Sequence, residues 1–366
     1  MRIVAIRTFL TGAVAGPVAV KPFLFVKLAT DAGVDGWGEA YALAGRERAI
    51  EQMILALGEA LIGKTAPGPR PFRASAVSGF ADKRTGIDFY CALSALEVAL
   101  WDLAGKHAGL PVHRLLGGTL RERIPLYANL WGGGRSSIEQ LVEDALEAKR
   151  QGFGFIKIYP MQLGCLDEAE AGVREIRRAV GPGLGIMIDL NALDDPHLAL
   201  QAAHRFGTDQ LFWREEPVTS DDLETLAWLR SRVAVRVASG ERHGGKFRFR
   251  EILERRAADV LNPDIVGCGG ILELLEIAAM AEAFSVAVSP HNYNSATFAM
   301  AAMLHASALM PNLLPAELYP GHVGHGAAFA EAGFAITDGH ATLAQAPGLG
   351  VTVDEAALIA LTGGSS

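Results

Sequence analysis

Residues 211–241 read LFWREEPVTSDDLETLAWLRSRVAVRVASGE, and the order of the patterns in this stretch predicts how the chain folds. It begins with a short apolar run that ends on Glu215, continues with a helical pattern over 221–231, and closes with a second apolar run that ends on Glu241. A strand, a helix and a second strand in this order form a parallel βα unit. Glu241 follows Glu215 by 26 residues, which fits one unit of a barrel, because eight units occupy about 250 residues.

The same unit repeats through residues 121–318. Short apolar runs alternate there with helical segments such as 138–151, 167–180 and 270–284. In chain order the runs are IPLYAN, GFIKIY, GIMIDL, LFWREE, VRVASGE, ADVLNPD, VAVSPH and LPAELY. Eight strands with intervening helices predict an α/β fold with a (β/α)8-type barrel, a modified TIM barrel, as the catalytic domain over 121–318.

The first third of the chain has a different pattern. Three strand-like segments precede two helical ones, at 1–10, 22–30, 31–40, 46–62 and from about Ala92 to His107. Strands followed by helices predict an α+β arrangement, so we expect a capping domain over 1–120. The Gly- and Ala-rich residues 319–366 are expected to return to this cap as a C-terminal segment.

The composition limits the kinds of partner. The chain has 366 residues, half of them apolar, and a formal net charge of −8, whereas a nucleic-acid binder needs a basic face. No apolar run reaches the roughly 18 residues of a membrane span, and the N-terminus lacks a signal-peptide pattern. Three cysteines without framework spacing are typical of reduced thiols. We therefore expect a cytoplasmic protein that binds a small molecule, and neither nucleic acid nor a membrane.

Polar residues end six consecutive apolar runs. They are Asp189, Glu215, Glu241, Asp264, His291 and Glu317, spaced 23 to 27 residues apart. Any one carboxylate after a strand is as readily a helix N-cap as a functional group. Six in the same register are hard to explain by capping, and the carboxyl ends of barrel strands form the active-site face.

Three of these carboxylates, Asp189, Glu215 and Glu241, come from consecutive units and are expected to face one cleft. They cannot all remain ionised close together without a cation. An all-oxygen ligand set favours Mg2+ over Zn2+ and leaves about three positions for water or substrate. Asn191, two residues after Asp189, is a candidate substrate contact or an ordinary turn residue, with nothing in the sequence to choose between them.

Asp264 and His291 end the next two runs. An Asp beside a His fixes the tautomer of the ring and raises its basicity, which suits a general base. Lys157 ends the second barrel strand, on the opposite side of the barrel from His291. It is either a cation for a substrate carboxylate, a second acid or base, or a solvated lysine at a strand end.

These residues resemble the enolase superfamily, in its mandelate racemase/muconate lactonizing enzyme-like family. The resemblance includes DGWGEA at 35–40, ALSALEVALWDLAGKHAGLPVHRLLGG at 92–118, the six strand ends and PGLGVTVD at 347–354. It implies a (β/α)7β barrel under an α+β cap, with Mg2+ held by Asp189, Glu215 and Glu241. It also implies that a proton is removed beside a carboxylate to form an enediolate, with His291 and Asp264 as the basic dyad and Glu317 on the substrate carboxylate.

One position departs from the family pattern. The second strand of this family usually ends Lys-x-Lys, and here Tyr159 stands at the second lysine. Tyr has a pKa near 10 and is a poor base at neutral pH, so one good base remains, His291. This favours an acid-sugar dehydratase, a lyase, over a racemase or epimerase, with Tyr159 as an acid or a pocket-lining hydroxyl.

Other activities of the resembled family stay open. A cycloisomerase, or an epimerase that uses Tyr159, is the nearest alternative, and a non-catalytic binding protein is a distant one. The resemblance also implies a homo-oligomer, and a cover for the substrate from segments near 11–22 and 41–46.

Overall fold

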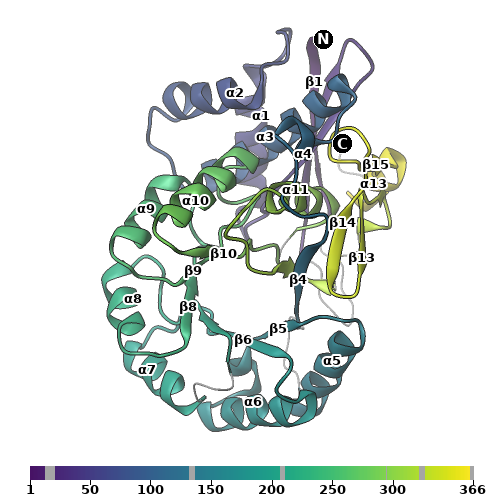
Figure 1. Ribbon diagram of the computed structural model, residues 1–366. Helices are drawn as coiled ribbons and strands as arrows, with labels where there is room; N and C mark the ends of the chain where they lie inside the picture. The colour runs from purple at the N-terminus through teal and green to yellow at the C-terminus, as the bar shows by residue number, and fades with distance from the viewer. Residues whose placement is uncertain (13–20, 132–136, 207–210, 294, 321–325, 363–366) are drawn as a thin grey trace.

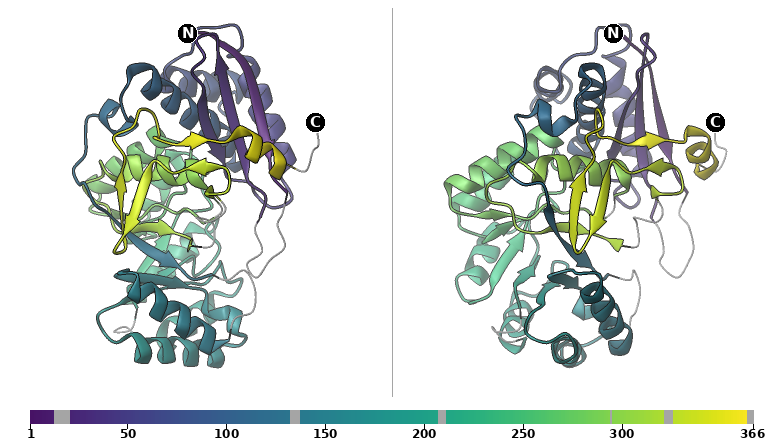
Figure 2. Two further views of the ribbon diagram at one scale, coloured as in Figure 1. Left: turned by 90° about the vertical axis from the view of Figure 1, so that its right-hand side faces the viewer. Right: turned by 45° about the vertical axis from the view of Figure 1, so that its right-hand side comes forward.

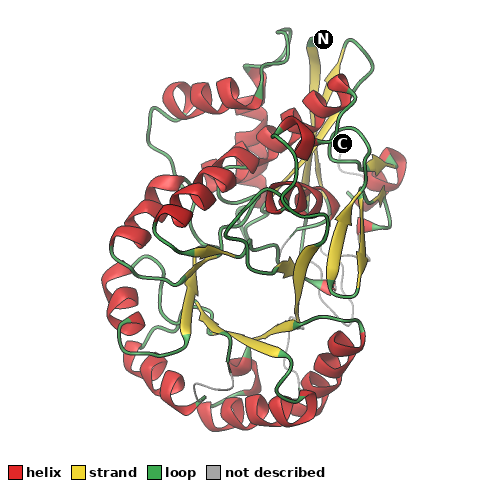
Figure 3. Ribbon diagram, viewed as in Figure 1, coloured by secondary structure: helices red, strands yellow, loops and turns green. Residues whose placement is uncertain are grey.

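A ring of parallel strands with helices outside it forms the larger part of the protein (Figures 1 and 3). The computed structural model describes residues 1–12, 21–131, 137–206, 211–293, 295–320 and 326–362. The barrel strands are β4 (Ile124–Asn129), β5 (Phe155–Ile158), β6 (Gly185–Asp189), β7 (Trp213–Glu215), β8 (Arg236–Ser239), β9 (Val260–Leu261), β10 (Ala287–Val288) and β11 (Ala316–Leu318). Each of the eight predicted runs contains one of them.

The strands lie in the order in which they occur in the chain. Parallel pairing runs from β4 through β10, and β11 returns to pair with β4. Backbone N–H groups of Leu314 and Glu317 donate to the carbonyls of Val288 and Pro290, which links β11 and the residues before it to β10 and the residues after it. The parallel βα barrel expected from the sequence is thus confirmed.

Helices surround the barrel, and several start at residues that satisfy their free N–H groups. They are α5 (Ile138–Arg150), α6 (Leu166–Val180), α7 (Pro196–Arg205), α8 (Leu223–Arg230), α9 (Lys246–Glu254), α10 (Ile271–Ala283) and α11 (Thr297–Ser307), with a short 3-10 turn η2 (Pro160–Leu163) after β5. Ser137 caps α5 by accepting from the Gln140 N–H, and Asp222 caps α8 by accepting from Thr225. These two caps begin α5 and α8 directly after the loops that follow β4 and β7.

The N-terminal unit is a three-stranded antiparallel sheet packed on helices. Its elements are β1 (Ile3–Leu10), β2 (Leu24–Thr30), β3 (Gly36–Ala40), α1 (Glu47–Glu59), α2 (Pro69–Ser75), the π-helix η1 (Ala76–Phe80), α3 (Ile87–Ala108) and α4 (Val112–Leu115). A Cβ on Gly38 would lie 2.1 Å from the Ala95 carbonyl oxygen, so only glycine lets β3 approach α3 this closely. The long helix begins at Ile87, five residues before its expected start.

A buried carboxylate joins this unit to the barrel. Glu39 on β3 is fully buried, and it accepts the N–H groups of Ala296 at 2.5 Å and Ala299 at 3.0 Å, at the start of α11. Beside it, the rings of Trp37 and Phe298 stack at 5.7 Å. Two backbone donors at a helix N-terminus are therefore satisfied by the cap sheet rather than by a local residue.

The C-terminal residues contact both parts of the chain (Figure 2). They form β12 (Ala330–Glu331), β13 (Phe334–Thr337), β14 (His340–Leu343), β15 (Thr352–Val353) and α13 (Glu355–Leu361). The β14 strand pairs with β4 of the barrel, whereas Glu355 forms an ion pair with Lys27 of β2 at 2.6 Å. We propose domain boundaries near residues 120 and 318, where the chain enters β4 and leaves β11. No helix within the described residues has the length and apolar character needed to cross a membrane.

Candidate active site

The carboxyl ends of the barrel strands face a cavity of about 440 Å3 that the cap closes from the other side. From the barrel, Lys157, Asp189, Glu241 and His291 line it, together with Asn191. From the cap, its lining includes Lys21, Tyr41, Arg46 and Ile87. Residues 13–20 of the expected covering segment lie outside the described part of the chain. Of the six strand-end residues, Asp189, Glu241 and His291 line this space. Glu215 and Glu317 contact Lys157, and Asp264 contacts His291, so these three lie directly behind the lining.

A larger cavity of about 920 Å3 lies between α11 and the C-terminal segment. Apart from Asn292, its lining comes from residues 295–355 and carries none of the strand-end acids. We assign the chemistry to the smaller cavity because the titratable groups converge there.

Lys157 is at the centre of the acidic cluster. Its Nζ lies 2.6 Å from Glu215, 2.9 Å from Glu317 and 3.8 Å from Asp189, and the side chain is 1% exposed. Asp189 and Glu215 are register partners on β6 and β7, which is why one lysine reaches both. Burial would lower the pKa of Lys157, but the surrounding carboxylates raise it well above its usual value. The carboxylates around Lys157 therefore favour its charged form.

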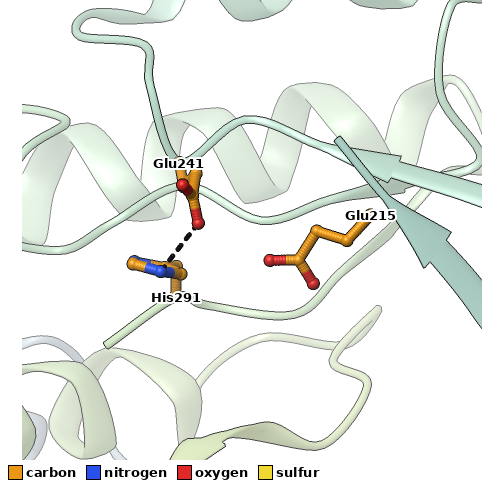
Figure 4. Close-up of side chains that lie close together, drawn as sticks. All are labelled: Glu215, Glu241 and His291. Atoms are coloured by element: carbon orange, nitrogen blue, oxygen red, sulfur yellow. Dashed lines mark ion pairs between the residues drawn. The ribbon is translucent and has the colours of Figure 1, made fainter. Parts of the chain in front are cut away.

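His291 is held by carboxylates at both ring nitrogens. Nδ1 lies 2.8 Å from Asp264 and Nε2 lies 2.8 Å from Glu241. Figure 4 shows the carboxylates of Glu215 and Glu241 pointing toward the imidazole. Burial disfavours the charged ring, but Glu317 and Glu241 raise the pKa of His291 well above its usual value. Asp264 thus fixes the ring through Nδ1, and Nε2 is the nitrogen that would exchange a proton with a substrate.

The carboxylates carry more negative charge than the nearby cations offset. Burial raises the pKa of Asp189 to about 7 and that of Glu215 to about 8, whereas contact with His291 overcomes burial and lowers the pKa of Glu241 to about 2. Acids held together in this way favour a further cation. The all-oxygen set of Asp189, Glu215 and Glu241 fits Mg2+. Those three would hold the ion.

Among the described residues, a group whose ligand atoms lie close enough together to share a metal ion differs from this set by one residue. Glu215, Glu241 and His291 each offer an atom within 4.8 Å of the others, and Asp189 is outside that group. We still prefer Asp189 as the third ligand, because both nitrogens of His291 already contact carboxylates and because Asp189 pairs with Glu215 in the sheet. The assignment of ligands remains a prediction.

Glu317 is tied into the site by backbone and side-chain donors. Its Oε1 accepts from Asn129 Nδ2 at 2.6 Å, and its Oε2 accepts from the Asn292 N–H at 2.8 Å. Burial raises the pKa of Glu317, but Lys157, His291 and the Asn292 N–H outweigh it, and the net shift is downward. Asn129 was not among the expected site residues, although it ends the first barrel run in the same register as the others.

Asn191 and Tyr159 have different positions relative to the cavity. Asn191 lines the cavity in a left-handed backbone conformation, with φ of 50°, and its Oδ1 accepts from Arg242 at 2.6 Å. Tyr159 is outside the set of residues that line the cavity, and its ring stacks on Trp131 with centroids 4.6 Å apart. The tyrosine that replaces the usual lysine is thus turned onto an aromatic neighbour.

Two further residues of the site gave no signal in the sequence. Glu216 is fully buried, has a φ of 42°, and accepts from Ser239 Oγ at 2.7 Å and from the Gly240 N–H at 3.1 Å. Arg242 lies 3.5 Å from Glu216 and 3.8 Å from Glu241. Together they brace the loop after β8, and a non-glycine residue with positive φ beside a ligand set is a common mark of a functional site.

Comparison with protein families agrees with this geometry. Residues 10–117 match the mandelate racemase/muconate lactonizing enzyme N-terminal domain, and residues 140–357 match the enolase C-terminal domain-like family. The chain belongs to the mandelate racemase/muconate lactonizing enzyme family of the enolase superfamily. This confirms the family resemblance seen in the sequence.

Curated and solved relatives of this family member span nearly the whole chain. It is 33% identical to the D-galactonate dehydratase of Ralstonia pickettii, over 92% of this chain and 90% of that one. An enolase from Sargasso Sea environmental sequencing superposes with a TM-score of 0.94 at 30% identity, covering 98% and 96% of the two chains. The 3,6-anhydro-D-galactonate cycloisomerase of Zobellia galactanivorans superposes with a TM-score of 0.89 at 29% identity, covering 98% of both. The chain is an enzyme of this superfamily, and its curated relatives indicate the hydro-lyase class.

Proposed function

We propose that this enzyme is a Mg2+-dependent acid-sugar dehydratase that converts a polyhydroxy carboxylate to a 2-keto-3-deoxy acid. One observation carries the proposal. Among the described residues that line the cavity, His291 is the one histidine, and Asp264 orients it, while Tyr159 stacks on Trp131 and is not part of the lining. A one-sided base suffices for dehydration, whereas racemisation requires a base on each face.

The proposed roles follow from position and charge. Mg2+, when bound by Asp189, Glu215 and Glu241, would supply a Lewis acid for the substrate carboxylate. Lys157 and Glu317 would hold that carboxylate, Lys157 as the cation and Glu317 through a shared proton. Lys157 lies on the opposite side of the strand ring from His291, so a substrate gripped there can present its α-hydrogen to the imidazole.

The proton balance is simple. His291 takes the α-proton from the substrate, and an enediolate forms on the carbon and carboxylate of the substrate. The protonated imidazole then gives a proton to the departing β-hydroxyl, the carbon–oxygen bond breaks, and water leaves. The resulting enol tautomerises to the 2-keto-3-deoxy acid. His291 therefore ends the cycle in its starting protonation state.

A screen tests the proposal. Purified enzyme with Mg2+ is incubated with mono- and diacid sugars, including D-galactonate, and 2-keto acids are detected by semicarbazide absorbance. We expect turnover of at least one acid, and none with His291→Asn of unchanged thermal stability. Inactivity of the wild type across the whole set would overturn the proposal.

A cycloisomerase is the second candidate, because a structural neighbour that spans the whole chain has that activity. Such a reaction uses the same one-sided α-proton removal, with a ring oxygen leaving instead of water. An epimerase is disfavoured by the position of Tyr159. Exchange of solvent deuterium into both faces of a substrate would support the epimerase. The homo-oligomer expected from the family remains a prediction.

A further inference from the structure

We propose that Lys21, at the mouth of the active-site cavity, binds a second carboxylate of the substrate, so that the preferred acid sugar is a diacid with a carboxylate at each end. The inference rests on the proposed function, since it names the substrate class of the same cavity. It goes further, because the residues with a part in the chemistry act at one end of the substrate and treat monoacids and diacids alike.

The cavity has a cation at its floor and others at its mouth. On the floor, the Lys157 side chain is 1% exposed, and its Nζ lies between Glu215 and Glu317. Lys21, from the cap, is exposed to solvent although it lines the same cavity. Exposed lining residues mark the side on which a cavity opens. A substrate whose reacting carboxylate lies at Lys157 therefore extends its other end toward the mouth and Lys21.

Lys21 differs from the other exposed cations of the lining, Arg46 and Arg242, in its contacts. Arg46 forms an ion pair with Asp88 at 2.9 Å, and Arg242 lies 3.5 Å and 3.8 Å from two carboxylates of the barrel loops. Among the residues that the structure describes, no carboxylate forms an ion pair with Lys21. Its Nζ lies instead 4.8 Å from the centre of the Tyr293 ring. Lys21 is thus the mouth cation with most of its binding capacity left for a ligand.

The contact with Tyr293 positions the ammonium group of Lys21 relative to the reacting end. Tyr293 follows the proposed base, His291, by two residues, and both line the cavity. The face of an aromatic ring attracts a cation without occupying all of its N–H donors, and a lysine has three of them. Lys21 is therefore held over the loop that carries the base and can still donate to an anion.

The charges at the mouth favour a carboxylate as the distal group. A hydroxymethyl group could accept a hydrogen bond from Lys21, but it would leave the ammonium charge unpaired once the substrate displaces water. A phosphate monoester carries more than one negative charge at neutral pH, and Asp189 and Glu241 line the same cavity and would repel the excess. A carboxylate brings a single negative charge and accepts charge-assisted hydrogen bonds from an ammonium group.

A matched pair of probes tests the assignment without requiring turnover. D-Galactonate and galactarate have the same carbons and the same hydroxyl configuration, and they differ only at C6, a hydroxymethyl group in one and a carboxylate in the other. Their binding to His291→Asn enzyme with Mg2+ is measured by titration calorimetry, alone and combined with Lys21→Met or Lys21→Arg. D-Galactonate 6-phosphate is the third probe. Lys64→Met, at an exposed lysine of the cap outside the cavity lining, is the matched control.

We expect galactarate to bind roughly five- to ten-fold more tightly than galactonate, and Lys21→Met to remove most of this difference by weakening galactarate alone. Lys21→Arg should retain the preference, Lys64→Met should change neither affinity, and added salt should reduce the preference. Equal affinities for the two acids, equal losses for both in Lys21→Met, or tighter binding of the phosphate ester than of the diacid would overturn the assignment.

Kinetics of the otherwise wild-type enzyme separate this assignment from the proposed function. Water leaves from the end of the diacid at His291, and the distal carboxylate neither gains nor loses a proton, so Lys21→Met should lower kcat/KM for galactarate mainly through KM. Dehydration of galactonate as efficient as that of galactarate, with both unchanged in Lys21→Met, removes the diacid and leaves the dehydratase. Lys21-dependent binding of galactarate without loss of water from any acid supports the diacid and removes the dehydratase.

Discussion

Replacing Asp264 with Asn tests the proposed base while leaving its shape in place. The Asp264 side chain is 1% exposed, its Oδ1 accepts the Val266 N–H at 2.8 Å, and its Oδ2 lies 2.8 Å from His291 Nδ1. The Val266 donor would keep the amide oxygen of Asn on the Oδ1 side and turn the NH2 group toward His291. Nδ1 must then accept, and the ring proton moves to Nε2, the nitrogen that faces Glu241.

An imidazole with its proton on Nε2 cannot take a proton at that nitrogen. A positioned general base is worth about 100- to 10,000-fold in rate, so we expect kcat to fall by that factor in Asp264→Asn. The folded state should change little, because Asn is nearly isosteric with Asp. Burial raises the pKa of Asp264, so its surroundings as a whole do not favour the ionised carboxylate over a neutral group. A neutral amide at this position should therefore change the free energy of unfolding little.

The assay follows α-proton exchange in D2O by NMR alongside kcat. Asp259→Asn is the matched control, since Asp259 immediately precedes β9 at the other end from the site, where it pairs with Arg230. The double variant with His291→Asn should be no slower than His291→Asn alone, because both changes remove one function. Rates in Asp264→Asn within three-fold of wild type, in both exchange and turnover, would refute the tautomer argument.

Four further outcomes are expected. Chelation should abolish turnover and Mg2+ should restore it, and Mg2+ should raise Tm in the wild type much more than in Glu241→Gln, as followed by calorimetry. Glu39→Ala should lower the free energy of unfolding by about 2–4 kcal/mol in urea, because two helix N–H groups lose their acceptor, whereas Glu39→Gln should lose less than half of that. Burial and His113 lower the pKa of His305 to about 3, so below about pH 6.5 the folded state binds fewer protons than the unfolded chain. The free energy of unfolding should therefore be highest above about pH 6.5 and should fall as the pH drops toward 3. In His305→Leu this fall should be less steep. Tyr159→Phe should keep dehydration within about three-fold of wild type, and a larger loss in kcat would show that the phenol takes part in proton transfer.

The sequence predicted the barrel well because a βα unit leaves a periodic signal. Each strand is short, buried and followed by a polar residue, and even β9 and β10, with two residues each in the ladder, were found from their flanking motifs. The same register brought Asp189, Glu241 and His291 to one cavity. Asn129 follows the same rule but was not predicted, because an uncharged amide at a strand end is equally typical of a turn.

The features that could not be predicted depend on side-chain direction and long-range contacts. Nothing local to Tyr159 shows that its ring stacks on Trp131, because the two residues lie 28 positions apart, each just after one of two neighbouring strands, β4 and β5. The left-handed backbone at Glu216 could not be predicted either, because the contacts that stabilise it come from Ser239, Gly240 and Arg242 in the next unit. Glu39 likewise finds its partners more than 250 residues away.

The register that makes the barrel predictable also makes its active site costly to fold. It brings ionisable side chains together where burial penalises charge, and Lys157 and His291 offset only part of that cost. A ligand that binds only the folded state stabilises it and so offsets part of this free-energy cost. We therefore expect the ion that supports catalysis to be a large contributor to stability as well. Removing a carboxylate would then weaken ion binding and yet stabilise the ion-free protein, and opposite changes of Tm with and without Mg2+ would show that the two effects share one source.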